Sequence, residues 1–309
     1  MDLRQLRYFL AIIECGSISH AARELNVAQP ALSLHIKNME TKLDTRLLHR
    51  SRSGVTPTEA GELLARRARS LLAELARTTD DIRTLDTDPA GVVRVGLTGT
   101  ISSIIALPLL KAARERYPRI QLNIAEAMSG FIAEWMAEGR VDIAVLYEAA
   151  RNEDMISELL LEEELVVLWP NGSNCKAQMS IEELRDVAMV VPSSVHGLRS
   201  QIDKALADKG IVPVIAIEID SYINIKRLVA EGFGASILPA HAVLQEAQDG
   251  TLCVSRITHP GLWRGAHLIS PSGRSVSRAQ EAISDLLREV IQNLLITGDW
   301  PATRSPQTG

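Results

Sequence analysis

The sequence predicts an α plus α/β protein with a small helical N-terminal domain, one long connecting helix and a larger α/β domain. Three observations support this prediction. Apolar residues recur at helical spacing through residues 3–43, and a second helical repeat runs on with no glycine between Gly61 and Gly91. From residue 92 onward, strand-like apolar runs alternate with helical segments. With 309 residues, 46% of them hydrophobic, the chain can bury at least two separate cores.

Charge is distributed unevenly along the chain. Residues 1–69 carry 11 Lys and Arg against 7 Asp and Glu, whereas the remaining 240 residues carry 22 against 31, in a chain of net charge −5. A basic N-terminal domain on an acidic body predicts that only the N-terminal domain approaches nucleic-acid phosphates.

The cysteines and the N-terminus bear on the cellular compartment. Cys15, Cys175 and Cys253 are far apart and form no CxxC or Cys/His cluster, so we expect no zinc finger, other metal site or disulfide framework. The first residues lack the pattern of a secretory signal. The most apolar run, residues 101–110, is too short to span a bilayer. We therefore expect a cytoplasmic protein with no membrane partner, and we identify no cofactor.

Three short helices are predicted at the start of the chain. The first ends at Gly16, and Ser17 or Ser19 can cap the second. Asn26 and the next residue make a turn, and Pro30 is expected at the first position of the third helix. Three helices with a tight turn between the second and third indicate a helix-turn-helix.

The solvent face of the third helix and the segment after it carry candidate DNA contacts. Glutamine reads adenine edges in the major groove, serine reaches a base or phosphate, and lysine attracts phosphates. Residues 50–54, RSRSG, place two arginines around a turn of small residues, which suits a wing against the DNA backbone. The predicted DNA-binding residues are Gln29, Pro30, Ser33, Leu34, His35, Lys37, Arg50, Arg52 and Thr56. The alternative is a helical domain with a merely solvated polar face.

The ordered string GSISHAARELNVAQPALSLHIKNMETKL, followed by RLLHR and VTPTEAG, resembles the N-terminal domain of the LysR-type transcriptional regulators. The resemblance is close over residues 1 to about 65 and extends in layout to the rest of the chain. It implies a winged helix-turn-helix over residues 1–58. Asp44 stands where the family usually has Gly, and Leu48 where it usually has Phe. Ala28 replaces a frequent capping Ser, at a cost of about 1 kcal/mol unless Asn26 substitutes.

Residues 59–88 are predicted to form a linker and dimerisation helix. Its apolar residues repeat at alternating steps of four and three, the heptad seam of a coiled coil, along a rod of about 43 Å. The predicted dimerisation residues are Leu64, Ala68, Leu71, Leu75 and Ile82. The alternative is an amphipathic helix folded onto its own domain. A dimer would carry two recognition helices, so we expect the double-stranded DNA target to be an interrupted palindrome.

Residues 89–297 are predicted to form an effector-binding domain, and residues 298–309 a tail that looks disordered from Asp299. A body of about 220 residues could form one doubly wound domain or two. Residues 138–144, EGRVDIA, and residues 229–239, VAEGFGASILP, resemble the LysR-type effector domain, which is similar to two-lobed periplasmic binding proteins. The resemblance implies lobe I at about 92–162 and 267–297, lobe II at about 163–266, and an inducer cleft between them. HGLR (196–199) with IEIDS (217–221) resembles the nitrogen-assimilation-control branch of the family.

Strand-to-helix junctions in this domain are the candidate ligand contacts, because ligands of α/β folds bind beyond the carboxyl ends of strands, near helix N-termini. Hydroxyls and free N–H groups at such junctions suit an organic acid or another anion. The predicted effector-binding residues are Thr98, Thr100, Ile101, Ser102, Ser129, Tyr147, His196 and Ser221. The alternative for each hydroxyl is a helix cap, and for His196 a surface histidine.

These observations predict a sequence-specific DNA-binding transcriptional regulator controlled by a small-molecule inducer, and not an enzyme. Ser193 and His196 hint at hydrolysis, but the chain has no GxSxG elbow, P-loop or metal-ligand spacing. A transport-type binding protein is disfavoured by the missing signal peptide and the fused N-terminal domain. A regulator whose C-terminal domain only oligomerises, and needs no inducer, stays open. The resemblance implies dimers joined into a homotetramer that bends DNA and contacts RNA polymerase.

Overall fold

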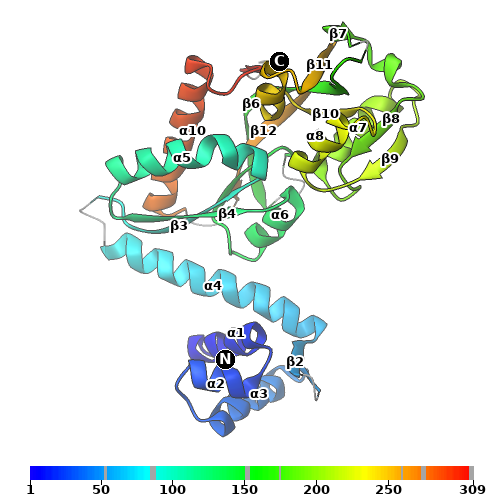
Figure 1. Cartoon of the computed structure of the whole chain (residues 1–309). Helices are drawn as coiled ribbons and strands as arrows, with labels where there is room; N and C mark the ends of the chain where they lie inside the picture. The colour runs from blue at the N-terminus through cyan, green and yellow to red at the C-terminus, as the bar shows by residue number, and fades with distance from the viewer. Residues whose placement is uncertain are drawn as a thin grey trace.

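The computed structural model describes residues 1–51, 54–83, 88–149, 154–173, 175–258, 260–272 and 276–305. The N-terminal domain lies at one end of the molecule and a two-lobed body at the other, with one long helix between them (Figure 1). This is the predicted fold class.

The N-terminal domain is a winged helix-turn-helix. Asp2 opens the first helix with a capping box to Gln5, and Gly16 ends it in the left-handed conformation at φ 60°. The hydroxyl of Ser17, rather than that of Ser19, caps the second helix. The elements are α1 (Leu3–Cys15), α2 (Ile18–Glu24), α3 (Gln29–Leu43) and an antiparallel wing of β1 (Leu48–Ser51) and β2 (Gly54–Pro57).

The turn into α3 differs in detail from the prediction. The helix begins at Gln29, so Pro30 takes the second helical position and not the first. The N-cap residue Ala28 makes no side-chain cap, while Asn26 adopts φ 54°, which asparagine tolerates better than most residues. At the other end of α3, Asp44 adopts φ 47°, the left-handed position that glycine fills without strain.

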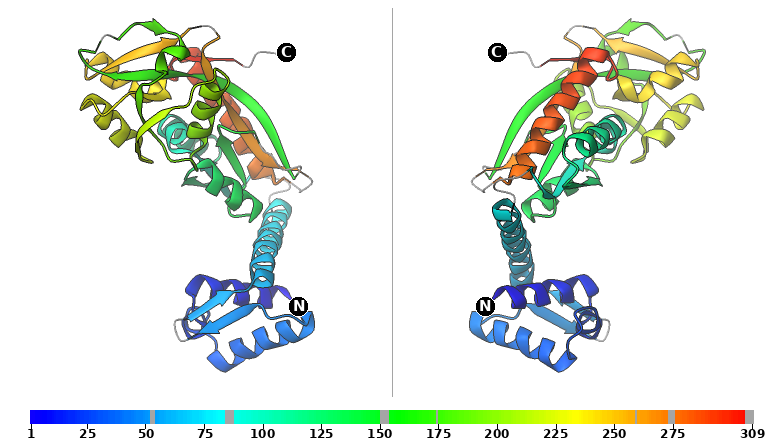
Figure 2. Two further views of the ribbon diagram at one scale, coloured as in Figure 1. Left: turned by 90° about the vertical axis from the view of Figure 1, so that its right-hand side faces the viewer. Right: turned by 90° about the vertical axis from the view of Figure 1, so that its left-hand side faces the viewer.

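The connecting helix α4 (Glu59–Arg83) starts inside the core of the N-terminal domain. The Thr58 hydroxyl accepts the Gly61 N–H at 3.0 Å. Ala68 is fully buried in that core and Leu64 packs against it. Within one chain, these two predicted dimerisation residues therefore pack on their own N-terminal domain, as the alternative to a dimer contact expects. Further along the helix, Leu71 and Ile82 are 54% and 70% exposed, and Leu75 is also exposed. Figure 2 shows the second half of α4 as a rod that leads to the body.

Lobe I is a sheet with helices on both faces. Its parallel strands are β3 (Gly91–Leu97), β4 (Ile120–Glu126) and β5 (Ile143–Leu146), and its order continues through β12 (Leu262–Pro271) to β6 (Met155–Pro170). The helices α5 (Gly99–Arg116) and α10 (Arg278–Thr297) pack on one face, whereas α6 (Ser129–Ala137) packs on the other. Strands β6 and β12 pair along their length and run on into lobe II.

Lobe II has its own core, which is built around the second half of β6. There β6 pairs with β10 (Ser236–Pro239) and β11 (Leu252–Ile257), and β11 pairs with β7 (Gln178–Met179). Strands β8 (Ala188–Val191) and β9 (Val214–Glu218) form a parallel pair. The helical elements are η1 (Ile181–Leu184), α7 (Gly197–Ala207), α8 (Tyr222–Ala230), η2 (Ala240–Val243) and α9 (Leu244–Gln248).

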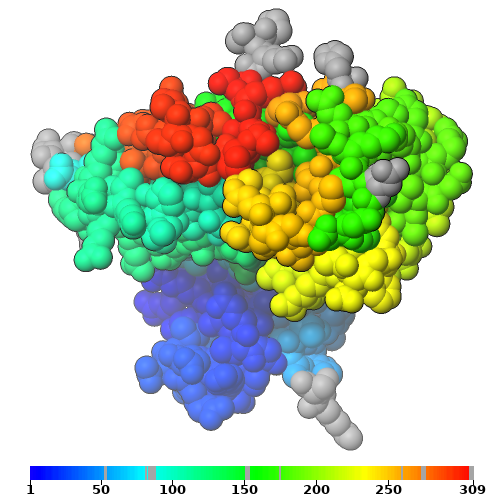
Figure 3. All heavy atoms as spheres, turned by 45° about the horizontal axis from the view of Figure 1, so that its top comes forward, coloured from blue at the N-terminus to red at the C-terminus, as the bar shows by residue number. Residues whose placement is uncertain are grey.

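The segment after α10 is packed up to residue 305, contrary to the expectation of a disordered tail. Gly298 ends the helix at φ 76°, and Trp300 is then only 1% exposed. Strand β13 (Thr303–Arg304) pairs with Glu162 and Glu163 of β6. Burial of the large indole ring and these strand bonds hold the segment in place. In Figure 3 the C-terminal segment, in red, lies against the yellow and orange part of lobe II.

Cys175 and Cys253 are joined by a disulfide, which corrects the expectation of no disulfide. The two residues are 78 positions apart in the sequence. Pairing of β11 with the end of β6 brings Cys253 opposite Trp169, next to the loop that carries Cys175. Among the described residues, no helix is long and apolar enough to cross a membrane, and no three His, Cys, Asp or Glu side chains cluster as metal ligands would.

The junction between α4 and the wing yields a stability prediction. A Cβ added at Gly61 would lie 2.1 Å from the Leu47 carbonyl oxygen. Gly61→Ala should therefore lower the free energy of unfolding by about 2 kcal/mol or more in chemical denaturation, although alanine is the better helix former by about 1 kcal/mol. The control is Gly130→Ala in α6, where an added Cβ meets nothing within 4 Å. A stabilised Gly61→Ala protein would show that this close approach does not exist.

Candidate nucleic-acid interface and ligand cleft

Six of the nine residues predicted to bind DNA gather on one concave surface formed by α3 and the wing. They are Gln29, Pro30, Ser33, Leu34, Lys37 and Arg50. The Gln29 amide donates to the Ser33 hydroxyl at 2.9 Å, which aligns two polar groups at the start of α3. Leu34 is 56% exposed, an apolar side chain with no contact in the core. This surface therefore offers polar groups, a cation and an apolar contact together.

The other three predicted residues lie elsewhere or outside the described part of the chain. His35 is half-buried, with its ring edge-on to that of Tyr8 at 5.2 Å, so it packs α3 on α1. Thr56 is exposed on β2, paired in register with His49. Arg52 is not among the described residues.

The sequence analysis missed two basic side chains of this surface, Arg46 and His49, which lie beside Arg50. Their place in the basic string RLLHR, directly before the wing, was the available signal. The Glu40 carboxylate accepts the Leu47 and Leu48 N–H groups at 2.9 and 3.3 Å, which fixes the wing against α3. The basic residues of the wing and the N-terminal turn of α3 thus form one continuous surface.

Six of the eight predicted effector-binding residues line a cleft of about 570 Å³ between the lobes. They are Thr98, Thr100, Ser129, Tyr147, His196 and Ser221. Ile101 and Ser102 do not line this cleft: both are buried in the first turn of α5, and Ile101 belongs to the lobe I core. Ser103, one residue further round the helix, lines the cleft instead.

Several helices begin at this cleft, and their caps differ. The His196 Nδ1 atom accepts the Leu198 N–H at 3.2 Å, and the Ser221 hydroxyl accepts the Asn224 N–H at 3.4 Å, so both residues cap their helices. Thr98 is the N-cap of α5 but makes no side-chain cap. Its hydroxyl is buried and has no partner among the described residues. The start of α5 therefore retains an unused hydrogen-bonding group on a residue that lines the cleft.

The floor of the cleft holds a buried cation that the sequence analysis missed, Arg264 of β12. Its guanidinium forms an ion pair with Glu163 on the neighbouring strand β6. The same group stacks on the Tyr147 ring at 3.4 Å and lies 3.5 Å from the Thr100 hydroxyl. That hydroxyl in turn donates to the Tyr147 oxygen at 3.0 Å. Two predicted cleft residues are thus positioned by Arg264.

The second oxygen of Glu163 faces away from the cleft. It accepts the Trp300 indole N–H at 3.1 Å and lies 3.1 Å from the His241 Nδ1 atom. Burial alone would raise the pKa of Glu163, but the charge and hydrogen bond of Arg264, together with the adjacent His241 ring, lower it from 4.5 to about 2. Glu163 is therefore ionised at neutral pH.

Other charged groups around the cleft are mostly engaged. Lys226 pairs with Glu246 at 2.5 Å. Asp220 accepts two hydrogen bonds from Ser193, which lower its pKa. Burial and the Arg264 charge lower the pKa of His196, so its ring is neutral at pH 7.

Comparison with known proteins identifies the chain. Residues 3–62 match the family model described as the bacterial regulatory helix-turn-helix protein of the lysR family, and residues 86–292 match the LysR substrate binding domain. The chain belongs to the LysR family. It is similar to the nitrogen assimilation regulatory protein nac of Escherichia coli K12, with 30% identity over 95% of this chain and 96% of that protein. This LysR-type regulator therefore combines a helix-turn-helix domain with a substrate-binding domain.

Solved structures share its fold. A full-length OxyR variant from Pseudomonas aeruginosa aligns over 94% of this chain and 95% of that chain, with a TM-score of 0.74 at 23% identity. Full-length CbnR in complex with its target DNA aligns over 94% and 100%, with a TM-score of 0.55 at 22% identity. The chain thus shares the fold of these two full-length structures.

The buried pair at the cleft floor predicts a large stability effect. Glu163→Gln leaves Arg264 buried without its counter-charge and should lower the free energy of unfolding at pH 7 by about 3–5 kcal/mol. Because the folded-state pKa of Glu163 is lowered to about 2, its carboxylate stabilises the fold above pH 4.5 and this contribution is lost as the pH falls towards 2. Urea denaturation should therefore show that the difference in unfolding free energy between Glu163→Gln and the parent protein shrinks as the pH falls from 4.5 towards 2.

The matched control is Glu162→Gln on the same strand, which breaks a more exposed pair with Arg304 and should cost at most about 1 kcal/mol. Equal losses in the two variants at pH 7 would contradict the account of the buried pair.

Proposed function

We propose that this LysR-type regulator reads an interrupted palindrome as a homodimer and responds to a small organic acid bound between its lobes. The dimers would pair along α4 and join into a tetramer that bends DNA and contacts RNA polymerase in the cytoplasm. The ligand-binding part of this proposal rests on the cleft of about 570 Å³, because six of the eight effector-binding residues predicted from the sequence line it.

The DNA-binding role is supported by the concave surface of α3 and the wing. Gln29 and Ser33 would face base edges, while Lys37, Arg46 and Arg50 would contact phosphates. Dimer formation is supported by the apolar stripe of Leu71, Leu75 and Ile82, whose side chains stay exposed to solvent in the part of one chain that the structure describes. Two such domains on one rod would meet two half-sites of a duplex.

Gln29→Ala and Arg50→Ala should separate base readout from phosphate attraction. Gln29→Ala should lose about 1–3 kcal/mol of discrimination between the target and a scrambled duplex, since the glutamine reads a base. Arg50→Ala should weaken binding to both duplexes alike and reduce the slope of log affinity against log salt concentration by about one. Fluorescence anisotropy at several salt concentrations measures both effects. Full discrimination by Gln29→Ala would overturn the placement of the recognition helix.

An acidic ligand is supported by what the cleft offers. The N-terminus of α5 and the buried Thr98 hydroxyl, which has no hydrogen-bond partner among the described residues, lie beside the hydroxyl of Thr100. Oriented N–H groups and hydroxyls of this kind suit a carboxylate. A C-terminal domain that only oligomerised would have no need to leave such a hydroxyl without a partner.

The competing proposal, a domain without an inducer, is tested by calorimetry with a panel of small organic acids. At least one acid should bind. Thr100→Ala should weaken the binding of that acid about tenfold or more, because Thr100 would contribute a hydrogen bond to a charged ligand. Thr251→Ala, an exposed threonine outside the cleft, is the control and should bind normally. The absence of heat and of any thermal shift across the panel would favour the oligomerisation role.

Transmission to DNA is supported by the contact between α4 and lobe I. Asp142 accepts the Arg77 guanidinium at 2.9 Å and the Arg94 N–H at 2.8 Å. A ligand that closes the cleft would change the spacing of paired N-terminal domains only by binding one arrangement more tightly than the other.

A further inference from the structure

Two helices of lobe I begin at the inter-lobe cleft without a side-chain cap. Thr98 precedes α5 and Met128 precedes α6, both residues line the cleft, and neither side chain makes a capping hydrogen bond. The two helices of lobe II that begin there are capped, α7 by His196 and α8 by Ser221. The uncapped helix N-termini of the cleft are therefore those of lobe I, and they favour a negative charge.

A buried hydroxyl lies on the same side of the cleft. Thr98 is 8% exposed and lines the cleft, and its Oγ1 atom has no hydrogen-bond partner among the described residues. A buried hydroxyl that lacks a partner costs free energy, and a ligand oxygen that accepted its hydrogen would recover that cost. This hydroxyl and the start of α5 together mark a place for a ligand carboxylate.

A carboxylate of the protein lies directly beside this place. Glu126 is in register with Leu97, the residue before Thr98, and it lines the same cleft. A Cβ added at Gly99 would lie 3.3 Å from the Glu126 Oε1 atom, so the carboxylate packs on the first turn of α5. Glu126 is exposed, and a carboxylate has about four acceptor sites, so it can accept hydrogen bonds from a ligand.

The two cations in the described lining are each paired with a carboxylate from outside it. Arg264 pairs with Glu163, and Lys226 pairs with Glu246. A ligand carboxylate at the start of α5 would therefore be repelled by Glu126 at close range. A ligand that also brought a positive charge to Glu126 would turn this repulsion into an attraction.

We propose that the inducer is an α-amino acid, whose carboxylate binds Thr98 and the start of α5 and whose ammonium group donates to Glu126. The two charged groups of such a ligand are attached to one carbon atom, just as the start of α5 and the Glu126 carboxylate are neighbours in the cleft. Hydrogen bonds between charged groups are stronger than neutral ones. This inference rests on the proposed function, because it names the class of organic acid that the cleft takes.

The proposed site adjoins a helix that reaches the linker. Ser129, in the first turn of α6, lines the cleft. Just beyond the other end of α6, Glu138 pairs with Arg69 of α4 at 3.9 Å. Binding at the cleft can therefore act on α4 through one helix.

The test is calorimetry on the full chain with three pairs of probes. Each pair is an amino acid and the acid of the same skeleton that lacks the amino group: L-alanine with propanoate, L-leucine with 4-methylpentanoate, and L-phenylalanine with 3-phenylpropanoate. In at least one pair the amino acid should bind about tenfold more tightly or better, because it alone can donate to Glu126. Glu126→Gln should remove this preference by weakening the amino acid and not its partner acid.

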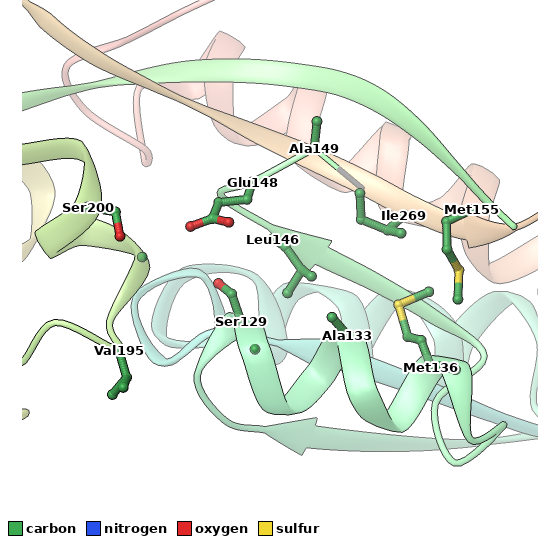
Figure 4. Close-up of a pocket in the computed structure, with 13 residues that line it drawn as sticks. Ser129, Ala133, Met136, Leu146, Glu148, Ala149, Met155, Val195, Ser200 and Ile269 are labelled. Atoms are coloured by element: carbon green, nitrogen blue, oxygen red, sulfur yellow. The ribbon is translucent and has the colours of Figure 1, made fainter. Parts of the chain in front are cut away.

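Two control variants locate the effect. Glu134→Gln removes an exposed carboxylate of α6 outside the cleft lining and should leave the preference unchanged. A second cavity, of about 510 Å³, shares Ser129 and Gly197 with the cleft, and Ala133 lines it (Figure 4). Ala133→Phe, which fills this second cavity, should leave amino acid binding unchanged.

The outcomes distinguish this inference from the proposed function. The inference is overturned, and an acid-binding cleft stands, if the partner acids bind as tightly as the amino acids or if Glu126→Gln keeps the preference. The same holds if other organic acids bind but none of the three amino acids does at millimolar concentration. Loss of amino acid binding in Ala133→Phe, at an unchanged melting temperature, would place the ligand in the second cavity and also overturn it. If no acid of any kind binds, both proposals fail.

Discussion

The ion pair between Glu163 and Arg264 is the interaction on which the geometry of the body depends. It is buried where β6 and β12 pass from one lobe to the other, and removing either partner would leave an uncompensated charge. On the cleft side, Arg264 supports Tyr147 and Thr100 of lobe I. On the other side, Glu163 receives Trp300 from the C-terminal segment. The pair therefore ties both lobes and the end of the chain to one point.

This arrangement keeps the cleft floor neutral while its rim stays open to hydrogen bonding. Glu163 compensates Arg264, and the cleft also offers helix N-termini and hydroxyls, among them those of Thr98 and Thr100. At the base of lobe I, Asp142 binds Arg77 of the linker helix. The described contacts thus run from the cleft, through the lobe I sheet and α6, to the helix that carries the N-terminal domain.

Local patterns were enough to predict much of this. Apolar spacing and cap residues predicted helices α1 to α4, and polar residues at strand ends predicted most of the residues that line the cleft. The pairing of Glu163 with Arg264 could not be predicted, because it depends on the register of strands 101 residues apart. The disulfide and the burial of Trp300 are equally non-local. Ile101 was misassigned because the junction pattern does not say which side of a first helical turn faces the ligand.

The central claim is that this regulator recognises DNA through α3 and the wing and does so at spaced, symmetric sites. Affinity selection of fragments from the source genome on the purified full-length protein, followed by sequencing, tests it most directly. The account predicts enrichment of a few interrupted palindromes with half-sites about one or more helical turns apart. No enrichment at low or moderate salt, with and without added cell metabolites, would contradict it.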